Sequence, residues 1–367
     1  MFRNLCLFLG VRQFFYVLLA LTGSTALLVA ATANSGQEAG KVRRLFPAER
    51  AQALLDFAKP GDVVTVPPGT YNSGLIVTKP IVVNLAGVVL AGVVEAKAIL
   101  LIKNVTGPVV INDFSADGRV SHARQGNLAG IRVSGVDFDV TINRARISHT
   151  VMGILTDNRG GRLHVRDSAL YHMGDSSIRS NLSHIIYAGS IDELLVYNTY
   201  LASSHALGHL LKSRSGTTRI TDSQILGLNS RHSRVLDLPC GGALTVLNST
   251  LQSSSLTDNV DMIAIGVEPP ENCVGGLVPG NISIHSSILV FDRNGSIEEP
   301  SSMFAKNLLF NWRTEISHFG FSGNTVVDPM GGIKAHAAHQ PHIVASENDL
   351  FTSRAEAGLS VLENTVP

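Results

Sequence analysis

The chain has 367 residues, of which 44% are hydrophobic and only 16% are charged, and its 29 basic and 29 acidic side chains cancel. This length suits one large or two ordinary domains. Charged residues make up about a quarter of a typical soluble domain, so the polar surface here comes mainly from Ser, Thr, Asn and Gly. Without an excess of positive charge, the chain does not have the composition of a protein that binds nucleic acid.

Residues 1–33 have the pattern of a secretory signal peptide. Arg3 and Arg12 precede an apolar run over residues 14–31, which ends in small residues that a signal peptidase accepts. The alternative is a retained membrane anchor. We expect a cleaved signal, a linker over residues 34–46, and a secreted or periplasmic protein of net charge −2 without stable membrane insertion.

Two cysteines remain once the signal peptide and its Cys6 are removed, and these are Cys240 and Cys273. In an exported protein such a pair favours one disulfide. Two separate thiols are the alternative.

A short helix is the first predicted element of the mature chain, over residues 47–59. Its apolar positions share one helical face, and a Pro-Gly-Asp sequence at residues 60–62 ends it. Since the open edge of a sheet needs cover, we expect this helix to cap the strands that follow.

A six-residue pattern then recurs along the chain. It reads apolar, any residue, Asn, Asp or Ser, then Ser or Thr, any residue, and apolar again. Its copies begin at positions 142, 165, 196, 220, 246 and 284, of which the first is degenerate. Units of about 24 residues with occasional longer steps are typical of a solenoid whose loops are inserted at one place in the unit.

The residues between these copies indicate which solenoid it is. They form short runs of Val, Ile, Leu and Thr broken by Gly, Asn, Asp and Ser, without helical spacing, so leucine-rich repeats are excluded. Parallel strands wound into a β-helix fit, because its coils lie about 4.8 Å apart and stack like residues on like. We expect Asn198, Asp222 and Asn248 to satisfy backbone groups in the turns.

The segment from Ala58 to Tyr71, followed by Ile76 to Ile81, resembles the opening coil of the pectate-lyase-like superfamily. With the repeats, the resemblance covers residues 47–345. It implies an all-β, single-chain, right-handed parallel β-helix with an N-terminal capping helix, followed by a tail or cap over residues 346–367. It also implies carbohydrate chemistry: lyases that act on uronic acids, polygalacturonase-like hydrolases, uronan epimerases, and members without known catalysis. The fold alone does not select among these.

Local likenesses narrow this range. The three motifs shared by the hydrolases are absent. Residues 211–216 resemble the strand that carries the base in chondroitinase B and related alginate lyases, but residues 236–239 read Leu-Asp-Leu-Pro where those lyases carry Leu-Arg-His-Gly. Residues 184–268 also resemble a group of bacterial exported β-helix proteins of uncertain activity.

Alignment of successive coils by the repeat brings polar side chains into two register positions. The first position holds Tyr187, Lys212 and Asp237, and the second holds His184, His209 and Arg234. Neighbouring members are expected about 4.8 Å apart, which is within reach of proton transfer.

Elimination across a uronic acid needs a base for the C5 proton, an acid for the leaving oxygen, and a cationic group for the carboxylate as it gains enolate charge. Lys212 or His209 is the expected base, Tyr187 the expected acid, and Asp237 is expected to orient Lys212. A structural ion pair is the alternative for Lys212 and Asp237.

Five further residues are candidates for substrate binding. Arg214 or Arg234 is expected to hold the substrate carboxylate, because a guanidinium group meets a carboxylate bidentately. His184 and His205 lie in the same basic region of the sequence, and Glu268 is a candidate acid, base or calcium ligand.

Strand alternation leaves two orientations for this segment. If Leu210 faces inward, Lys212 does too, whereas an inward Leu211 sends Leu210, Lys212 and Arg214 outward. We favour the second, because it avoids burying a charge.

The sequence shows no complete site for a transition metal. His336, His339 and His342 recur every three residues, but neither a cysteine nor a carboxylate cluster accompanies them. We expect no cofactor, with calcium left open as an alternative.

Together these patterns predict an exported, monomeric lyase that cleaves an acidic polysaccharide by β-elimination. A uronan C5-epimerase is the second interpretation, because it uses the same base and carboxylate-binding group. A non-catalytic carbohydrate-binding or export-associated β-helix protein is the third.

Overall fold

The computed structural model describes residues 47–123, 126–135, 137–174, 183–205, 207–293, 307–330, 335–337 and 342–360. The chain divides into two units, Met1–Arg44 and Leu45–Pro367, and all of these residues belong to the second. The predicted signal peptide and linker lie outside the described residues. Within these ranges, no helix has the length and apolar character needed to cross a membrane.

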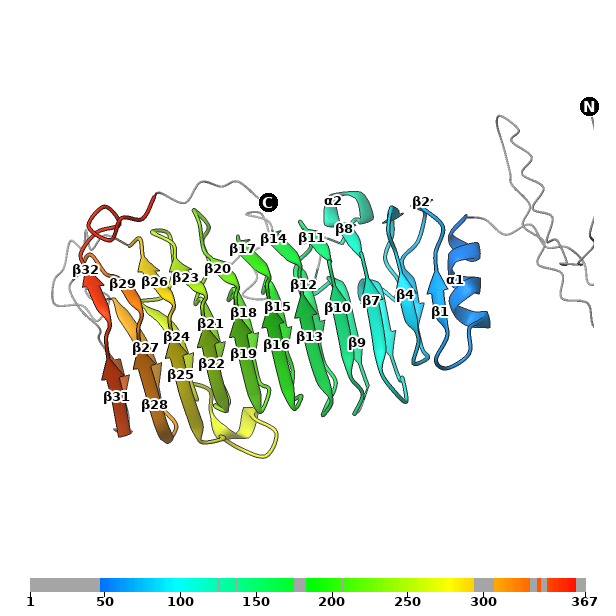
Figure 1. Cartoon of the computed structure of the whole chain (residues 1–367). Coiled ribbons are helices and arrows are strands. Elements are labelled where there is room, and N and C mark those ends of the chain that lie inside the picture. Colours follow the sequence, from blue (N-terminus) through cyan, green and yellow to red (C-terminus); the bar gives the residue numbers. More distant parts are fainter. Residues whose placement is uncertain are drawn as a thin grey trace, which may run out of the picture. The chain divides into compact units, whose positions relative to one another are not determined.

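The second unit is a right-handed parallel β-helix, as predicted. Each coil contributes one strand to each of three long sheets in turn, and every strand pairs in parallel with its equivalents in the neighbouring coils (Figure 1). Connections between parallel strands of one sheet are right-handed in about 98% of cases. We call the three sheets the first, second and third in the order in which a coil visits them.

Within each sheet, the strands lie side by side in chain order. The first sheet contains β1 (Val63–Thr65), β4 (Val82–Asn84), β7 (Val109–Asn112), β10 (Val140–Asn143), β13 (Arg162–Arg166), β16 (Glu193–Tyr197), β19 (Thr217–Thr221), β22 (Ala243–Leu247), β25 (Gly280–His285), β28 (Ile316–Ser322) and β31 (His342–Ser346). The second sheet contains β8 (Ser115–Asp117), β11 (Arg146–Ser148), β14 (Ala169–Met173), β17 (Tyr200–Ser204), β20 (Gln224–Leu226), β23 (Thr250–Ser253), β26 (Ile288–Phe291), β29 (Thr325–Val327) and β32 (Asp349–Phe351). The third sheet contains β3 (Leu75–Val77), β6 (Ala98–Lys103), β9 (Ala129–Ser134), β12 (Met152–Thr156), β15 (Ile186–Ala188), β18 (Leu211–Ser213), β21 (Leu236–Leu238), β24 (Asp261–Ile265), β27 (Leu308–Trp312) and β30 (Ala335–Ala337). In the first coils β2 (Gly69–Tyr71) pairs with β5 (Val88–Leu90).

The predicted capping helix is α1 (Pro47–Phe57), which lies beside the first coil (Figure 1). Ala51 and Leu55 on its inner face are buried against the core. The Gln52 side chain donates to the Ile76 carbonyl at 2.9 Å and accepts from the Ile76 N–H at 2.8 Å. The helix therefore satisfies the open edge of β3, which would otherwise expose unpaired backbone groups. Two shorter helices, α2 (Gly118–Ser121) and η1 (Pro270–Asn272), lie in connections.

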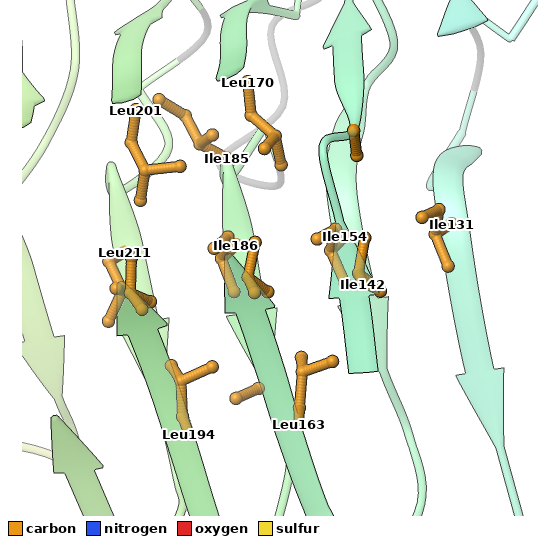
Figure 2. Packing of buried hydrophobic residues seen from close by; sticks show 14 of the residues in the cluster. Ile131, Ile142, Ile154, Leu163, Leu170, Ile185, Ile186, Leu194, Leu201 and Leu211 are labelled. Carbon is orange, nitrogen blue, oxygen red and sulfur yellow. The ribbon is translucent and has the colours of Figure 1, made fainter. Parts of the chain in front are cut away.

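The core is a stack of aliphatic side chains that repeat from coil to coil. Ile131, Ile154, Ile186 and Leu211 occupy equivalent positions of the third sheet, and all are fully buried (Figure 2). Each side chain packs on its counterpart in the next coil, so burial and strand register support each other.

The Ser or Thr of the repeated pattern forms a ladder of hydrogen bonds between coils. The Thr199 N–H donates to Ser223 Oγ at 3.1 Å, the Ser223 N–H to Ser249 Oγ at 3.1 Å, and the Ser249 N–H to Ser287 Oγ at 3.1 Å. Each hydroxyl also donates within its own coil, as Ser223 does to the Thr221 carbonyl at 2.8 Å. The repeat recurs because each turn between the first and second sheets satisfies the one before it.

The Asn or Asp that precedes this hydroxyl lies in the left-handed backbone region, as the turn requires. Asn198, Asp222 and Asn248 have φ values of 45°, 51° and 47°, a conformation that Asn and Asp adopt more readily than other side chains do. Their side chains also bond between coils, since Asn248 donates to Asp222 at 2.5 Å. These residues lie in the turns, as predicted, but the described contacts of their side chains are with the equivalent residues of neighbouring coils, and the Ser and Thr hydroxyls satisfy the turn backbone instead.

Strand pairing continues past residue 345, where we expected the β-helix to end. The last described strand, β32, pairs with β29, so the coils extend to Phe351. Beyond it, Arg354 makes two hydrogen bonds to the Asp292 carboxylate, at 2.6 and 2.7 Å. This ion pair holds the chain after β32 against an earlier coil.

We expect a Ser223→Ala substitution to lower the free energy of unfolding by about 1 to 3 kcal/mol, because the buried Thr199 N–H loses its acceptor. Guanidinium chloride unfolding followed by circular dichroism measures the change. Ser283→Ala, on the solvent side of β25, is the matched control. Equal effects of the two substitutions would show that the ladder contributes nothing specific.

Candidate active site

The predicted column of polar side chains is present on the outer face of the third sheet. Tyr187 of β15 pairs in register with Lys212 of β18, and Lys212 pairs with Asp237 of β21. Within β18, Leu211 and Ser213 are fully buried and Lys212 points away from the core, which is the orientation we favoured.

Leu210 differs from this expectation, because it is also fully buried. Residue 210 precedes β18, at the point where the chain turns into the third sheet. Strand alternation applies only within the strand, so both leucines enter the core.

Asp237 is the most deeply buried acid of the column, with a side chain only 2% exposed. Its carboxylate lies 3.5 Å from Lys212 Nζ, 3.2 Å from His209 Nε2 and 3.3 Å from Arg234 Nη1. Burial raises the pKa of Asp237, and the positive charges of Lys212 and Arg234 oppose that rise. Three donors therefore surround one buried carboxyl group.

His184 and His209 form a stack in which each ring accepts a backbone N–H from the next coil. The ring centroids lie 5.2 Å apart. His184 Nδ1 accepts from the His209 N–H at 2.9 Å, and His209 Nδ1 accepts from the Arg234 N–H at 3.2 Å. Burial, followed by neighbouring positive charge, holds the pKa of both rings well below the usual value. Each ring is therefore neutral with its proton on Nε2, which for His209 faces Asp237.

Glu268 joins the column from a loop rather than from a strand. Lys212 Nζ donates to Glu268 Oε1 at 2.7 Å, and Arg214 donates to the other oxygen of the same carboxylate. Although partial burial raises the pKa of Glu268, the hydrogen bonds from Lys212 and Arg214 outweigh it and lower the pKa below its ordinary value.

The predicted disulfide between Cys240 and Cys273 is present and anchors this loop. Cys240 follows β21, and Cys273 lies in the long connection between β24 and β25. The Glu268 N–H also donates to the Pro239 carbonyl at 3.2 Å. The loop is thus fastened beside the column at two points.

Arg234 is held by acids on two coils. Its Nε donates to Asp261 at 2.7 Å, and Asn311 donates to the same Asp261 oxygen at 3.1 Å. The sequence did not identify Asp261 or Asn311 as part of the site. The strand register could have identified them. Asp237 of β21 pairs with Ala264 of β24, and Ala264 pairs with Asn311 of β27.

A groove of about 380 Å³ lies over the third sheet beside these charges. Its floor includes Arg132, Leu155 and Tyr187, which stand in register on successive coils, and Arg214 lies beside them. Arg132, which the sequence did not single out, pairs with Asp157 at 2.6 Å. Asn272 and Val274 of the disulfide-bonded loop also line the groove.

Tyr187 connects the groove with the charged cluster. Its ring centroid lies 5.6 Å from Lys212 Nζ and 5.3 Å from Arg214 Cζ, and the His184 ring meets it edge-on at 5.4 Å. Among the four predicted catalytic residues, Tyr187 is the one that lines the groove.

His205 lies in a different stack. Its ring stacks on that of His172 at 5.7 Å between centroids, and His172 in turn lies 5.5 Å from His149. These contacts are at the end of the second sheet rather than in the column of Lys212.

The predicted histidine series is only partly covered by the structure. Position 336 pairs with Asn311 in the third sheet and position 342 begins β31, whereas His339 lies outside the described residues. Within the described ranges, one set of residues is compact enough to hold a metal ion, namely Cys240, Glu268 and Cys273. The two sulfurs of that set are bonded to each other and do not act as thiolate ligands.

No family model and no curated protein matches the sequence. Three similar solved structures have low identity. A mutant of the DFA-IIIase from Arthrobacter chlorophenolicus A6 in complex with DFA-III has a TM-score of 0.42 and 14% identity, over 87% of this chain and 86% of that one. Pectate lyase Pel9A has a TM-score of 0.39 and 13% identity over 85% and 72%. A PL6 alginate lyase in complex with a trisaccharide has a TM-score of 0.29 and 11% identity over 83% of each chain. The likeness is one of fold, and the parallel β-helix implied by the opening coil is confirmed by the strand pairing of this chain itself.

The lowered pKa of Glu268 predicts a pH-dependent contribution to stability. The ionised carboxylate stabilises the fold at neutral pH, and this contribution is lost as the pH falls through the folded-state pKa, which lies below the ordinary value of about 4.3. We expect Glu268→Gln to lower the midpoint of thermal unfolding at pH 7, and to lower it less at a second, acidic pH below the folded-state pKa, where wild type has also lost the charge.

Glu271→Gln, on an exposed position of the same loop, is the control and is expected to leave the midpoint unchanged at both pH values. A difference between wild type and Glu268→Gln that does not shrink on acidification would contradict the assignment.

Proposed function

We propose that the protein binds an acidic polysaccharide in the groove over the third sheet and cleaves it by β-elimination. The observation that carries this proposal is the carboxylate of Glu268, which Lys212 and Arg214 hold beside the ring of Tyr187. These two cations already bind one carboxylate. In the complex, the uronate carboxylate of the substrate takes the place of the Glu268 carboxylate.

Arg214 supplies the electrostatic part of the reaction, and Lys212 adds to it as it takes up the C5 proton and regains its positive charge. Arg214 faces the groove, and its guanidinium group offers a pair of N–H donors to a carboxylate. Abstraction of the C5 proton moves negative charge onto that carboxylate, so a cation already in position stabilises the transition state more than the ground state. Arg234 is less suited to this role, because Asp261 and Asp237 engage it.

The proton transfers are assigned to Lys212 and Tyr187. Once Glu268 has moved away, Lys212 passes its ammonium proton to the Asp237 carboxylate, which lies 3.5 Å from Nζ and whose pKa burial raises. The neutral amine then takes the C5 proton, and the electron pair of the C5–H bond forms the C4–C5 double bond. The bond from C4 to the bridging oxygen breaks, and the hydroxyl of Tyr187 gives its proton to that oxygen.

His209 was the other predicted base, and its contacts favour a positioning role instead. Its Nδ1 lone pair accepts the Arg234 N–H, and its Nε2 proton faces Asp237. The ring therefore lacks an available acceptor for the C5 proton. Its effect is to hold the Asp237 carboxylate beside Lys212.

A non-catalytic polysaccharide-binding protein is the second candidate. The observation that supports it is the pairing of each charged side chain in the cluster with opposite charges. The Asp237 side chain is 2% exposed and the Lys212 side chain 13% exposed, and each has partners of opposite charge. A network in which opposite charges are paired also suits a structural role. Either function requires the chain to reach a polymer outside the cytoplasm, for which we propose export through the predicted signal at residues 1–33.

Incubation with a panel of uronic-acid polymers, including polygalacturonate, alginate and a glycosaminoglycan, is expected to raise ultraviolet absorbance from unsaturated chain ends. We expect Tyr187→Phe and Arg214→Ala each to lower kcat/KM by about 10² to 10⁴. Arg219→Ala, an exposed arginine of the first sheet, is the control and should retain the wild-type rate.

If no polymer of the panel gives a rise in absorbance but at least one still binds, the lyase is rejected and the second candidate is supported. Incorporation of solvent deuterium at C5 without chain cleavage would instead identify an epimerase.

A Glu268→Gln substitution is expected to tighten binding of an acidic oligosaccharide by about three- to tenfold, because the competing carboxylate is removed. Isothermal titration calorimetry with an oligouronate measures the change, and Glu271→Gln is the control. Weaker binding by Glu268→Gln would mean that Glu268 contacts the substrate rather than competing with it.

A further inference from the structure

A second hollow, of about 600 Å³, lies over the second sheet and the turns that lead into it from the first sheet. It is lined by residues of four successive coils, including Arg146, Ala169, Tyr200 and Gln224. The charged cluster around Lys212 is on the third sheet, so this hollow belongs to a different face of the β-helix.

The hollow lies where a small residue, Ala169, occurs in a column of long side chains that face outward. Arg146, Ala169, Tyr200 and Gln224 stand in register on β11, β14, β17 and β20. The neighbouring Leu170 is fully buried in the core, so Ala169 points outward. Its methyl group leaves a notch two coil spacings wide, or roughly 10 Å, between the long side chains of Arg146 and Tyr200.

Tyr200 forms an aromatic wall that is already fixed in place. The ring packs against the buried cluster of Ala202, Leu226 and Leu228. Burial also raises the pKa of Tyr200 above its ordinary value, and its phenol is protonated at neutral pH, as that of an unperturbed tyrosine is. A tyrosine held in this way offers a flat apolar surface and one hydroxyl without further loss of side-chain freedom.

The rim of the hollow consists of amides and carboxylates whose positions the turns determine. Asp167 accepts from the Asn198 amide at 2.6 Å, and Asp222 accepts from the Asn248 amide at 2.5 Å. Each of these two acids therefore keeps a fixed orientation toward the hollow. Gln224 adds an amide, which both donates and accepts hydrogen bonds.

Acids outnumber bases in the lining of this hollow, whereas in the groove on the third sheet Arg132, Arg159 and Arg214 outnumber Asp157. Two carboxylates, of Asp167 and Asp222, face one guanidinium group, that of Arg146. An anionic polymer is therefore disfavoured here, whereas fixed carboxylates and amides beside an aromatic face suit the hydroxyls and the apolar face of an uncharged sugar.

We propose that this hollow is a second carbohydrate-binding site, specific for uncharged sugar units. It holds a neutral glycan, or a neutral stretch of a mixed polymer, on a face separate from the groove. This proposal does not depend on the activity assigned to Tyr187, Lys212 and Arg214.

Affinity electrophoresis in gels that contain a neutral polysaccharide tests the proposal, with mixed-linkage β-glucan, xylan and galactomannan as the neutral probes and polygalacturonate as the acidic one. We expect at least one neutral polymer to retard the wild-type protein. Ala169→Lys fills the notch and Tyr200→Ala removes the wall, and each is expected to weaken that retardation by about tenfold or more.

Thr250→Lys is the matched control, because Thr250 continues the same column beyond the hollow. It should retain wild-type retardation, and thermal unfolding of all three variants checks that they fold. Arg214→Ala should also retain retardation by the neutral polymer, which separates this site from the groove.

The proposal is overturned if no neutral polymer retards wild type, or if folded Ala169→Lys and Tyr200→Ala both migrate as wild type does. If polygalacturonate alone retards wild type, and Ala169→Lys abolishes that retardation, the assignment to uncharged sugars is overturned.

Discussion

Hydrogen bonding between successive coils is the constraint on which the rest of this structure depends. Each strand pairs in parallel with its equivalents in neighbouring coils, so every position of one coil lies about 4.8 Å from the same position in the next. The hydroxyl ladder through Thr199, Ser223 and Ser249 extends this pairing through the turns, where backbone groups would otherwise be buried without partners. Any residue that faces outward is thereby placed in a column.

In the charged site, too, side chains accept backbone N–H groups of a neighbouring coil, but here they are histidines. The rings of His184 and His209 accept backbone N–H groups of the following coil, as the hydroxyls do elsewhere. The second ring therefore has a determined tautomer and directs its remaining proton to Asp237. The hydrogen bonds that join successive coils therefore continue into the charged site. The buried carboxyl group of Asp237 is tolerated because donors from two coils surround it.

Two faces of one β-helix differ in the balance of their charges. On the third sheet, Arg132 and Arg214 line a groove beside a carboxylate that the chain itself provides. On the second sheet, Asp167 and Asp222 line a hollow with a tyrosine wall. The net charge of the whole chain is zero, so it describes neither face. Local charge decides which ligands each surface accepts.

The sequence by itself determined the β-helix and the register of Tyr187, Lys212 and Asp237, because a repeat aligns coils without knowledge of their packing. Only the tertiary structure decided that Leu210 turns inward and that Asp261 supports Arg234. It also decided that Glu268 reaches Lys212, since that residue lies in an inserted loop without periodicity. Periodic positions are placed by the ladder between coils, whereas an insertion is placed by its own contacts, which for this loop are the disulfide of Cys240 and the hydrogen bond to Pro239.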